Sequence, residues 1–523
     1  MTTRGLAGIG IVVLAAGCGP PARAGAPAPA PSPASAPPRG GLADPNATSE
    51  TRALFTNLRA LAREHVLFGH QDDLAYGVSW RDEPGRSDVK ETAGAYPAVY
   101  GWDAGHIELA DPANLDRNNF EKMRRWIGEG YARGGVVTLS WHLDNPVSGG
   151  NAWDTTRAVA AVLPGGARNA EYRRWLDRLA AFVTSLRGRR GEPIPVVFRP
   201  YHEMSGSWFW WGGRHATPAE YVALWRLTVE YLRDTRGVHN LLYAYSPDAT
   251  GSKEQYLERY PGDAYVDVLG FDDYQSVKSV ATRAVLVRRL RDVVELAEAR
   301  GKIPAMTETG VVTIPDSTWW TQTLLAGIES DPVARRIAWV LVWRNANRVT
   351  DRPGHFYAPY PGHSSAADFV RFRQDPLILF EDGLPDLYRE GAPPRSRTEV
   401  RVRQARPCAP HATRTEATSH DAWNPRRCRG RRRPSRPAGR RAARRRPAPP
   451  DARGARARRF DRLPHDAGGE GRTDDAGRHH PVPARRPEGA RPGPAGPGEA
   501  AGRDRRPEDR LDSEHPGRRP VGR

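Results

Sequence analysis

Eight short apolar runs alternate with amphipathic helical segments between residues 46 and 390, and this alternation constrains the fold more than any other feature of the chain. Such an order is typical of a parallel sheet whose strands are joined by crossover helices. Eight strand–helix units in about 345 residues predict an α/β protein with a (β/α)₈ TIM barrel. The expected strands are 66–68, 98–100, 136–139, 196–198, 241–244, 266–269, 303–306 and 338–342.

Three of the intervening segments have apolar residues spaced by three and four, as in a helix with one buried face. They begin near Phe120, Tyr172 and Tyr221. The third has a clear start, because Thr217, Pro218 and Glu220 stand in the order of a capping box with a first-turn proline.

Polar and aromatic residues follow every expected strand, where the loops of a TIM barrel carry reactive groups. These exits are 69–72, 101–103, 140–144, 199–203, 246–248, 271–274, 307–310 and 343–345. A doubly wound open sheet is the alternative fold. The first strand, however, is not followed by a glycine-rich phosphate loop of the expected spacing.

The fourth exit, within residues 196–212, combines ionisable and aromatic side chains. Arg199, His202 and Glu203 follow the strand, and Trp208 to Trp211 come directly after. Indole rings stack on the C–H faces of sugars while a carboxyl group acts on the glycosidic oxygen. The alternative for the tryptophans is a core aromatic cluster.

Glu203 and Glu308 follow the fourth and seventh strands, which lie on opposite sides of a barrel mouth. Two carboxyl groups that flank one bond are the arrangement of a glycosidase. If the enzyme retains configuration, we expect the groups to be roughly 5 Å apart. A single glutamate is more often a surface carboxylate, so their shared position at strand exits carries the prediction.

Three segments, 199–204, 208–212 and 307–310, resemble glycoside hydrolase family 26, most of whose members are endo-β-1,4-mannanases. The resemblance covers about residues 50–390. It implies a (β/α)₈ barrel and a retaining double displacement with Glu203 as acid/base and Glu308 as nucleophile, without a cofactor. His202 precedes the acid/base as in this family, where related barrel glycosidases more often have Asn.

The same resemblance implies substrate-binding residues beside the pair. In it, His142 and Trp153 line the glycone-side subsite, Trp208 stacks near the cleavage point, and Tyr274 orients the nucleophile. His202, Asp272 and Arg344 complete the set, and His70, Asp103 and Trp343 are weaker candidates. Each has a structural alternative, such as a buried histidine for His142. A loop tryptophan such as Trp153 would be costly exposed surface without a binding role.

Metal catalysis is a rival interpretation, because His70, His142 and His202 follow three of the strands. Residues 46–390 have no His-x-x-x-His pattern and no cysteine pair, so we expect no metal. A sugar-binding protein without catalysis is the alternative of another class. The presence of both glutamates argues against it.

Residues 1–19 have the layout of a bacterial secretory signal: Arg4, an apolar run and a small-residue exit at Cys18. The residues before Cys18 resemble a lipobox, which predicts a membrane tether through lipidated Cys18, with plain secretion as the alternative. Residues 20–45, rich in Pro and Ala, are expected to form a linker. The other cysteines are Cys408 and Cys428, so no disulfide is expected in the barrel.

The net charge of +18 resides in residues 391–523, which hold 35 arginines, no lysine and 16 acidic residues. The rest of the chain has a net charge of −1. This composition predicts a disordered tail. It also fits an out-of-frame reading of a GC-rich gene, and an intact mass of the natural protein tests that hypothesis. An anion-binding arm is the alternative.

Together these features predict an exported endo-β-1,4-mannanase that acts on mannan or galactomannan. A β-1,3-xylanase or mixed-linkage β-glucanase is the alternative within the family, because these enzymes share both glutamates. The expected partner is the polysaccharide alone. We expect a monomer and no bound nucleic acid.

Overall fold

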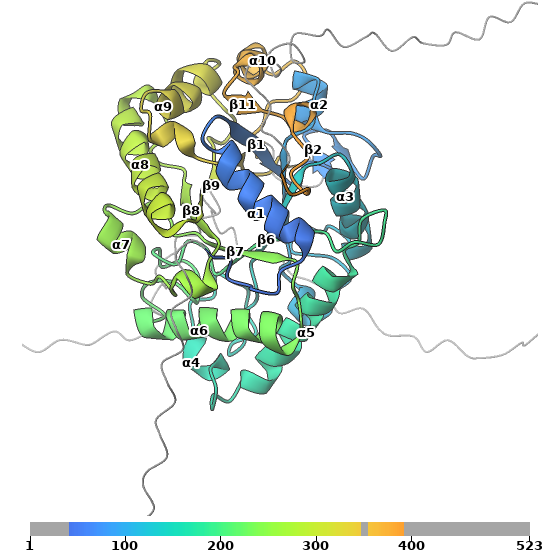
Figure 1. Ribbon diagram of the computed structural model, residues 1–523, viewed down its shortest axis with the longest axis vertical. Helices are drawn as coiled ribbons and strands as arrows, with labels where there is room; N and C mark the ends of the chain where they lie inside the picture. Colours follow the sequence, from blue (N-terminus) through green and yellow to red (C-terminus); the bar gives the residue numbers. More distant parts are fainter. Residues whose placement is uncertain (1–40, 347–353, 392–523) are drawn as a thin grey trace, which may run out of the picture. The chain divides into compact units, whose positions relative to one another are not determined.

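The computed structural model describes residues 41–346 and 354–391, which form a closed barrel of eight parallel strands (Figure 1). Each strand pairs with the next in chain order, and β10 pairs back to β1. The predicted (β/α)₈ barrel is confirmed. Its strands are β1 (Val66–Gln71), β4 (Val99–Asp103), β5 (Val136–Trp141), β6 (Val196–Pro200), β7 (Leu241–Tyr245), β8 (Val268–Asp273), β9 (Ile303–Thr309) and β10 (Trp339–Val342).

Helices surround the barrel, and the three predicted from apolar spacing are α3, α5 and α6. The capping box is present at the start of α6, where the Thr217 hydroxyl and the Glu220 carboxylate each accept a backbone N–H of the other residue. The helices are α1 (Ser49–Leu61), α2 (Asp88–Ala93), α3 (Phe120–Ala132), α4 (Val159–Val162), α5 (Asn169–Ser185), α6 (Pro218–Glu230), α7 (Lys253–Leu257), α8 (Arg283–Arg300), α9 (Ala326–Glu329) and α10 (Ala366–Gln374).

Single turns of 3₁₀ or π geometry connect or extend several of these elements. They are η1 (Ile107–Leu109), η2 (Tyr231–Thr235), η3 (Asp263–Tyr265), η4 (Val280–Thr282), η5 (Trp320–Leu325), η6 (Ala334–Arg336) and η7 (Glu381–Gly383). Helix α6 therefore continues into the π turn η2, in which Leu232 is buried.

Helix α1 lies across the end of the barrel at which the strands begin (Figure 1). Its buried residues Leu54 and Leu58 belong to the same apolar cluster as Leu67 of β1 and Val197 of β6. This packing closes one end of the barrel, so the loops that follow the strands form the open mouth. Residues 41–45, expected to end the linker, instead belong to the folded part, where Ala43 and Asp44 are buried.

Three very short strands were not expected from the sequence. Strands β2 (Tyr76–Gly77) and β3 (Trp80–Arg81) form a hairpin after β1, and β11 (Ile378–Leu379) pairs with the first residues of β1. Two residues are too few to produce a periodic apolar pattern, so only long-range pairing reveals them.

Within the described residues, no helix has both the length and the apolar character needed to cross a membrane. The predicted signal at 1–19, most of the predicted linker and nearly all of the predicted basic tail lie outside the described residues.

Candidate active site

A β-bulge in β9 places Glu308 in the barrel mouth. On β8, Phe271 pairs with Met306 but the next residue, Asp272, pairs with Glu308, so Thr307 is the extra residue. Strict alternation would turn Glu308 away from the interior if Thr307 faced inward. The Thr307 hydroxyl donates to Asp272 Oδ1 at 2.7 Å, and Glu308 contacts residues of the same interior network. The bulge therefore directs neighbouring side chains to the same site.

Glu203 is held by a strained turn at the end of β6. Tyr201 and Glu203 have φ values of 49° and 54°, in the left-handed region that non-glycine residues rarely adopt. The Glu203 N–H donates to the carbonyl of Ser246 at 2.7 Å, which anchors the turn to the exit of β7. Such strain is of order 1–3 kcal/mol for each residue and is concentrated at functional sites.

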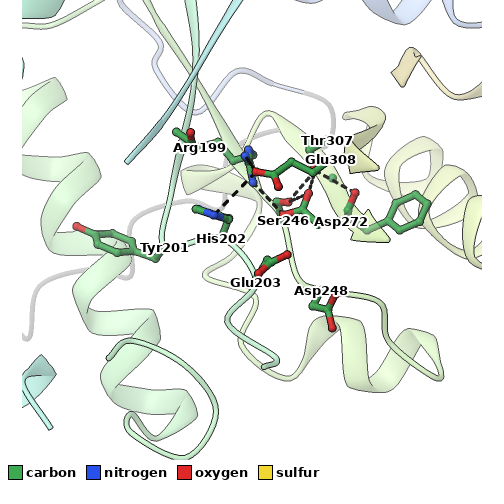
Figure 2. A network of polar contacts seen from close by, with 12 residues as sticks. Arg199, Tyr201, His202, Glu203, Ser246, Asp248, Asp272, Thr307 and Glu308 are labelled. Atoms are coloured by element: carbon green, nitrogen blue, oxygen red, sulfur yellow. Dashed lines mark hydrogen bonds and ion pairs between the residues drawn. The ribbon is translucent and has the colours of Figure 1, made fainter. Parts of the chain in front are cut away.

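One carboxylate oxygen from each of Glu203, Asp272 and Glu308 lies within 4.8 Å of the other two, and the three side chains lie close together in Figure 2. Glu203 is 3% exposed and Glu308 is 4% exposed, so both are largely shielded from bulk water. The two glutamates predicted to face each other are thus brought together in the barrel mouth, close enough for both carboxyl groups to act on one bond.

Arg199 connects Glu308 to Asp272 from the interior end of the site (Figure 2). Its guanidinium donates to Asp272 Oδ2 at 2.9 Å and forms an ion pair with Glu308 Oε1. Burial opposes the charge of Arg199, but Asp272 and Glu308 raise its pKa above the ordinary value, so the group stays protonated. Burial raises the pKa of Asp272 to about 8 against the pull of Arg199, and the charge of Glu308 adds to the increase.

Tyr274 holds the other oxygen of Glu308. Its hydroxyl donates to Oε2 at 2.8 Å, and burial followed by the charge of Glu308 raises the pKa of Tyr274 well above its ordinary value. The phenol therefore remains a hydrogen-bond donor. Arg199 and Tyr274 together fix the orientation of the Glu308 carboxylate.

A buried chain of polar contacts runs from the Asp103 carboxylate through the His142 ring to the His202 ring. Asp103 Oδ2 lies 2.7 Å from His142 Nδ1, and His142 Nε2 lies 3.1 Å from His202 Nε2. Burial alone would lower the pKa of His142, but the charge and hydrogen bond of Asp103 outweigh it and raise the pKa. Burial, Arg199 and His142 hold the pKa of His202 well below its usual range, so His202 is neutral.

Aromatic rings line one side of the pair. Trp153 is half-buried and stacks on His142 with ring centroids 5.3 Å apart, and Phe209 contacts both rings. The indole Nε1 of Trp208 donates to Glu203 Oε2 at 2.6 Å. Trp210 and Trp211 are fully buried, so the aromatic block divides into a half-buried Trp208 beside the glutamates and a core part behind it.

Arg344 belongs to a neighbouring cluster. Its Nε lies 3.1 Å from Asp116 Oδ1, and its guanidinium lies over the ring of Tyr76. Trp343, one residue earlier, has its ring 6.3 Å from His142. His70 pairs with Asp73 at 2.8 Å, so it does not join the other two histidines.

Two residues have larger roles in this geometry than the sequence indicated. Arg199 was noted only as part of the fourth exit, and Asp103 only as a weak candidate. Both occupy the barrel interior near the ends of their strands, where a charged residue must have a partner. A charge at the end of an otherwise apolar strand was therefore the available signal.

The three clustered carboxylates are also the described residues that could hold a cation. Arg199 already supplies a positive charge to two of them. A metal ion at this position would have to displace that guanidinium. The residues therefore fit a network of ion pairs around Arg199 better than a metal site.

Comparison with known proteins was consistent across sequence and structure. The family model for glycosyl hydrolase family 26 matches residues 43–341. The mannan endo-1,4-beta-mannosidase of Bifidobacterium adolescentis is 37% identical over 351 residues, which is 63% of this chain and 34% of that protein. A Bacillus subtilis protein of the same name is 31% identical, and this chain covers 66% of its length. The chain thus spans about a third to two thirds of these relatives.

Solved structures of the same family superpose on the barrel. A family 26 beta-mannanase from Bacteroides ovatus is 47% identical with a TM-score of 0.63, covering 66% of this chain and 98% of the other. A modular endo-beta-1,4-mannanase from Cellulomonas fimi is 40% identical with a TM-score of 0.62, covering 68% and 80%.

Proposed function

The chain belongs to glycosyl hydrolase family 26, and from that membership we propose that it is an endo-acting β-1,4-mannanase that retains anomeric configuration. The relatives named above are described as mannan endo-1,4-beta-mannosidases, which supports mannan as the substrate class. The observation that carries the mechanism is the proximity of Glu203 and Glu308, each of which has an oxygen within 4.8 Å of an oxygen of the other.

In the first step, Glu308 attacks the anomeric carbon while Glu203 protonates the leaving glycosidic oxygen. Arg199 and Tyr274, which donate to the Glu308 carboxylate, keep that carboxylate facing the sugar. The product of this step is a glycosyl ester on Glu308 and a released chain with a new hydroxyl group. Two groups about 5 Å apart leave no room for a water between them, which favours this route over direct inversion.

In the second step, Glu203 acts as a base and takes a proton from a water molecule that attacks the same carbon. The ester bond to Glu308 breaks, and the sugar leaves with its original configuration. Trp208 remains hydrogen-bonded to Glu203 Oε2 and so holds one oxygen while the other exchanges the proton.

Sugar binding on the glycone side is assigned to His142 and Trp153, which form one stacked surface beside the pair. His202 lies between this surface and Glu308, with Nε2 3.9 Å from Glu308 Oε1. We assign Trp208 to stacking near the cleaved bond, because its half-buried indole donates to Glu203.

The direct test is to incubate the full chain with β-mannan, β-1,3-xylan and mixed-linkage β-glucan and to follow product sizes over time. We expect a rapid fall in mannan chain length with short oligosaccharides as products, and no turnover by the Glu308→Gln variant. Turnover of another polymer with mannan left intact would refute the substrate assignment. Release of only monosaccharide or disaccharide from the start would refute endo action.

We also propose that the protein is exported and tethered through a lipid on Cys18. The support is the order of residues 1–19, a basic start followed by an apolar run and Cys18. The mass of the N-terminal peptide from the native host tests this: a diacylglyceryl cysteine is expected, whereas an unmodified Cys18 or cleavage elsewhere would contradict the tether.

A further inference from the structure

A pocket of about 590 Å³ lies at the closed end of the barrel, far along β9 from the catalytic mouth. It is formed by the last turns of α1, the end of α8, the start of β9 and η6. Pro304 lines it, whereas Glu308 of the same strand faces the mouth. Nothing in the proposed reaction uses this pocket. Its charged lining residues are Arg59, Arg63, Glu64, Glu298, Lys302 and Arg336.

Four cations and two carboxylates line the pocket, so the lining has a net positive charge. Arg336 is satisfied by Glu298, to which it donates twice at 2.7 and 2.9 Å. Among the described residues, no ion pair within 4.0 Å includes Arg59 or Arg63, and the charge that acts most on Arg59 is that of Arg63. The excess positive charge therefore comes from the C-terminal end of α1 and the turn that follows it.

Arg59 lies in the last turn of α1, and Arg63 lies four residues later in the turn that follows the end of the helix at Leu61. Their like charges repel each other. Burial and the charge of Arg63 lower the pKa of Arg59 below its ordinary value. Lys302 is buried at 2% exposure, and although Asp267 and Asp263 stabilise its charge, Arg59 opposes it. The C-terminal end of the α1 dipole favours a cation by only about 0.3–1 kcal/mol. Like charges gathered in one concave site are stabilised further when an anion binds between them.

We propose that this pocket binds a phosphate group. Arginine donates in a planar fork that matches phosphate oxygens, and a phosphate has enough acceptor oxygens for two guanidinium groups at once. A carboxylate carries one charge and two oxygens, so it would leave part of this donor set unmatched. Arg59 is positioned in advance, because its guanidinium packs over the Phe55 ring at 5.2 Å.

The pocket also adjoins the point where the described chain begins. Lys302 Nζ donates to the carbonyl of Gly41 at 2.8 Å, so the N-terminal segment joins the barrel beside these cations. A lipid on Cys18 would be separated from Gly41 by only 22 residues. The membrane surface would then be within reach of the closed end. The phosphate can therefore come from a lipid headgroup or from solution.

The test uses the full-length protein and two double variants with equal loss of charge. Arg59→Gln/Arg63→Gln removes two of the four pocket cations, and Arg174→Gln/Arg288→Gln removes two exposed arginines elsewhere. Thermal midpoints are measured in inorganic phosphate and in sodium chloride of equal ionic strength. We expect phosphate to raise the midpoint of the wild type and the control by about 2 °C or more, and to leave the pocket variant unchanged.

An equal phosphate shift in the wild type and the pocket variant would overturn the proposal, as would no shift in either. Arg59→Lys/Arg63→Lys retains the charge and should recover part of the shift, which separates binding from a folding defect. Cosedimentation with phosphatidylcholine–phosphatidylglycerol vesicles distinguishes the sources. Weaker binding by the pocket variant than by the control indicates a headgroup, and equal binding indicates free phosphate. The basic tail is the same in every variant.

Discussion

Trp208 donates its indole N–H to Glu203, so the aromatic surface that we assign to substrate is joined directly to the proposed acid/base. The contact spans five residues within one loop, and Gly206 lies between the two partners. This link makes the position of the Glu203 carboxylate dependent on the position of an indole ring.

Trp208→Phe keeps an aromatic face but removes the donor to Glu203. A hydrogen bond to a charged group contributes about 1.5–3 kcal/mol, which predicts a fall in kcat/KM of about 10- to 100-fold. Steady-state kinetics on mannan measure it. Trp210→Phe is the matched control, because Trp210 donates to the Leu143 carbonyl and should affect stability more than rate. Equal kinetic losses in both variants would contradict the assignment.

Gly206→Ala should act through the same contact. A Cβ at this position would lie 2.2 Å from the Trp208 ring, so the indole would have to move. We expect kcat/KM to fall with little change in the unfolding midpoint. The double variant Gly206→Ala/Trp208→Phe tests the cause, since a smaller ring relieves the clash. The fall in kcat/KM of the double variant should not exceed that of Trp208→Phe alone. Falls in kcat/KM that add in the double variant would exclude this coupling.

Arg199→Met should destabilise the protein by about 3–5 kcal/mol, because it leaves Asp272 and Glu308 buried beside each other without a cation. Arg199→Lys keeps the positive charge but loses the planar guanidinium that bonds to both carboxylates, so we expect a smaller loss of stability. Urea unfolding with catalysis measured in parallel checks both. A change below about 1 kcal/mol for Arg199→Met would show that the guanidinium does not hold the two carboxylates together.

Asp103→Asn should reduce stability in a limited range of pH. Burial alone would raise the pKa of Asp103, but His142, Ser140 and the Gly105 N–H lower it to about 2 from its ordinary 3.8. This contribution is complete above pH 3.8 and is lost as the pH falls through 2. The pKa of His142 is instead raised above 6.5, so its contribution is complete below pH 6.5 and is lost as the pH rises through the raised value.

The difference in unfolding free energy between wild type and Asp103→Asn should therefore be largest between pH 3.8 and 6.5. We expect the pKa shift of Asp103 alone to contribute about 2 kcal/mol to this difference in unfolding free energy. Denaturant unfolding at pH 3, 5 and 8 measures it. A difference that does not vary with pH would mean that Asp103 acts only as a hydrogen-bond acceptor without an ion pair.

The barrel could be predicted from the sequence because each strand carries its own apolar pattern and each exit its own polar residues. Glu203 and Glu308 followed from this order, since strand number alone sets their places around the mouth. The bulge at Thr307 could not be predicted, because it depends on pairing with β8 rather than on local sequence. The same holds for β11, which pairs with β1 across 312 residues between Val66 and Ile378.

The contacts that complete the site are also long-range. Arg199 reaches Asp272 across 73 residues and Glu308 across 109, and His142 reaches Asp103 across 39. A sequence pattern shows that a buried charge needs a partner but not which one. The left-handed conformations of Tyr201 and Glu203 were equally hidden, since neither is a residue type that favours them.

The anomeric configuration of the first product tests the central claim most directly. Proton NMR during the first minutes of mannan hydrolysis distinguishes the two anomers of the new reducing end before they interconvert. Attack by Glu308 followed by water on the opposite face predicts a β-configured product. An α-configured first product would contradict the double displacement by Glu203 and Glu308.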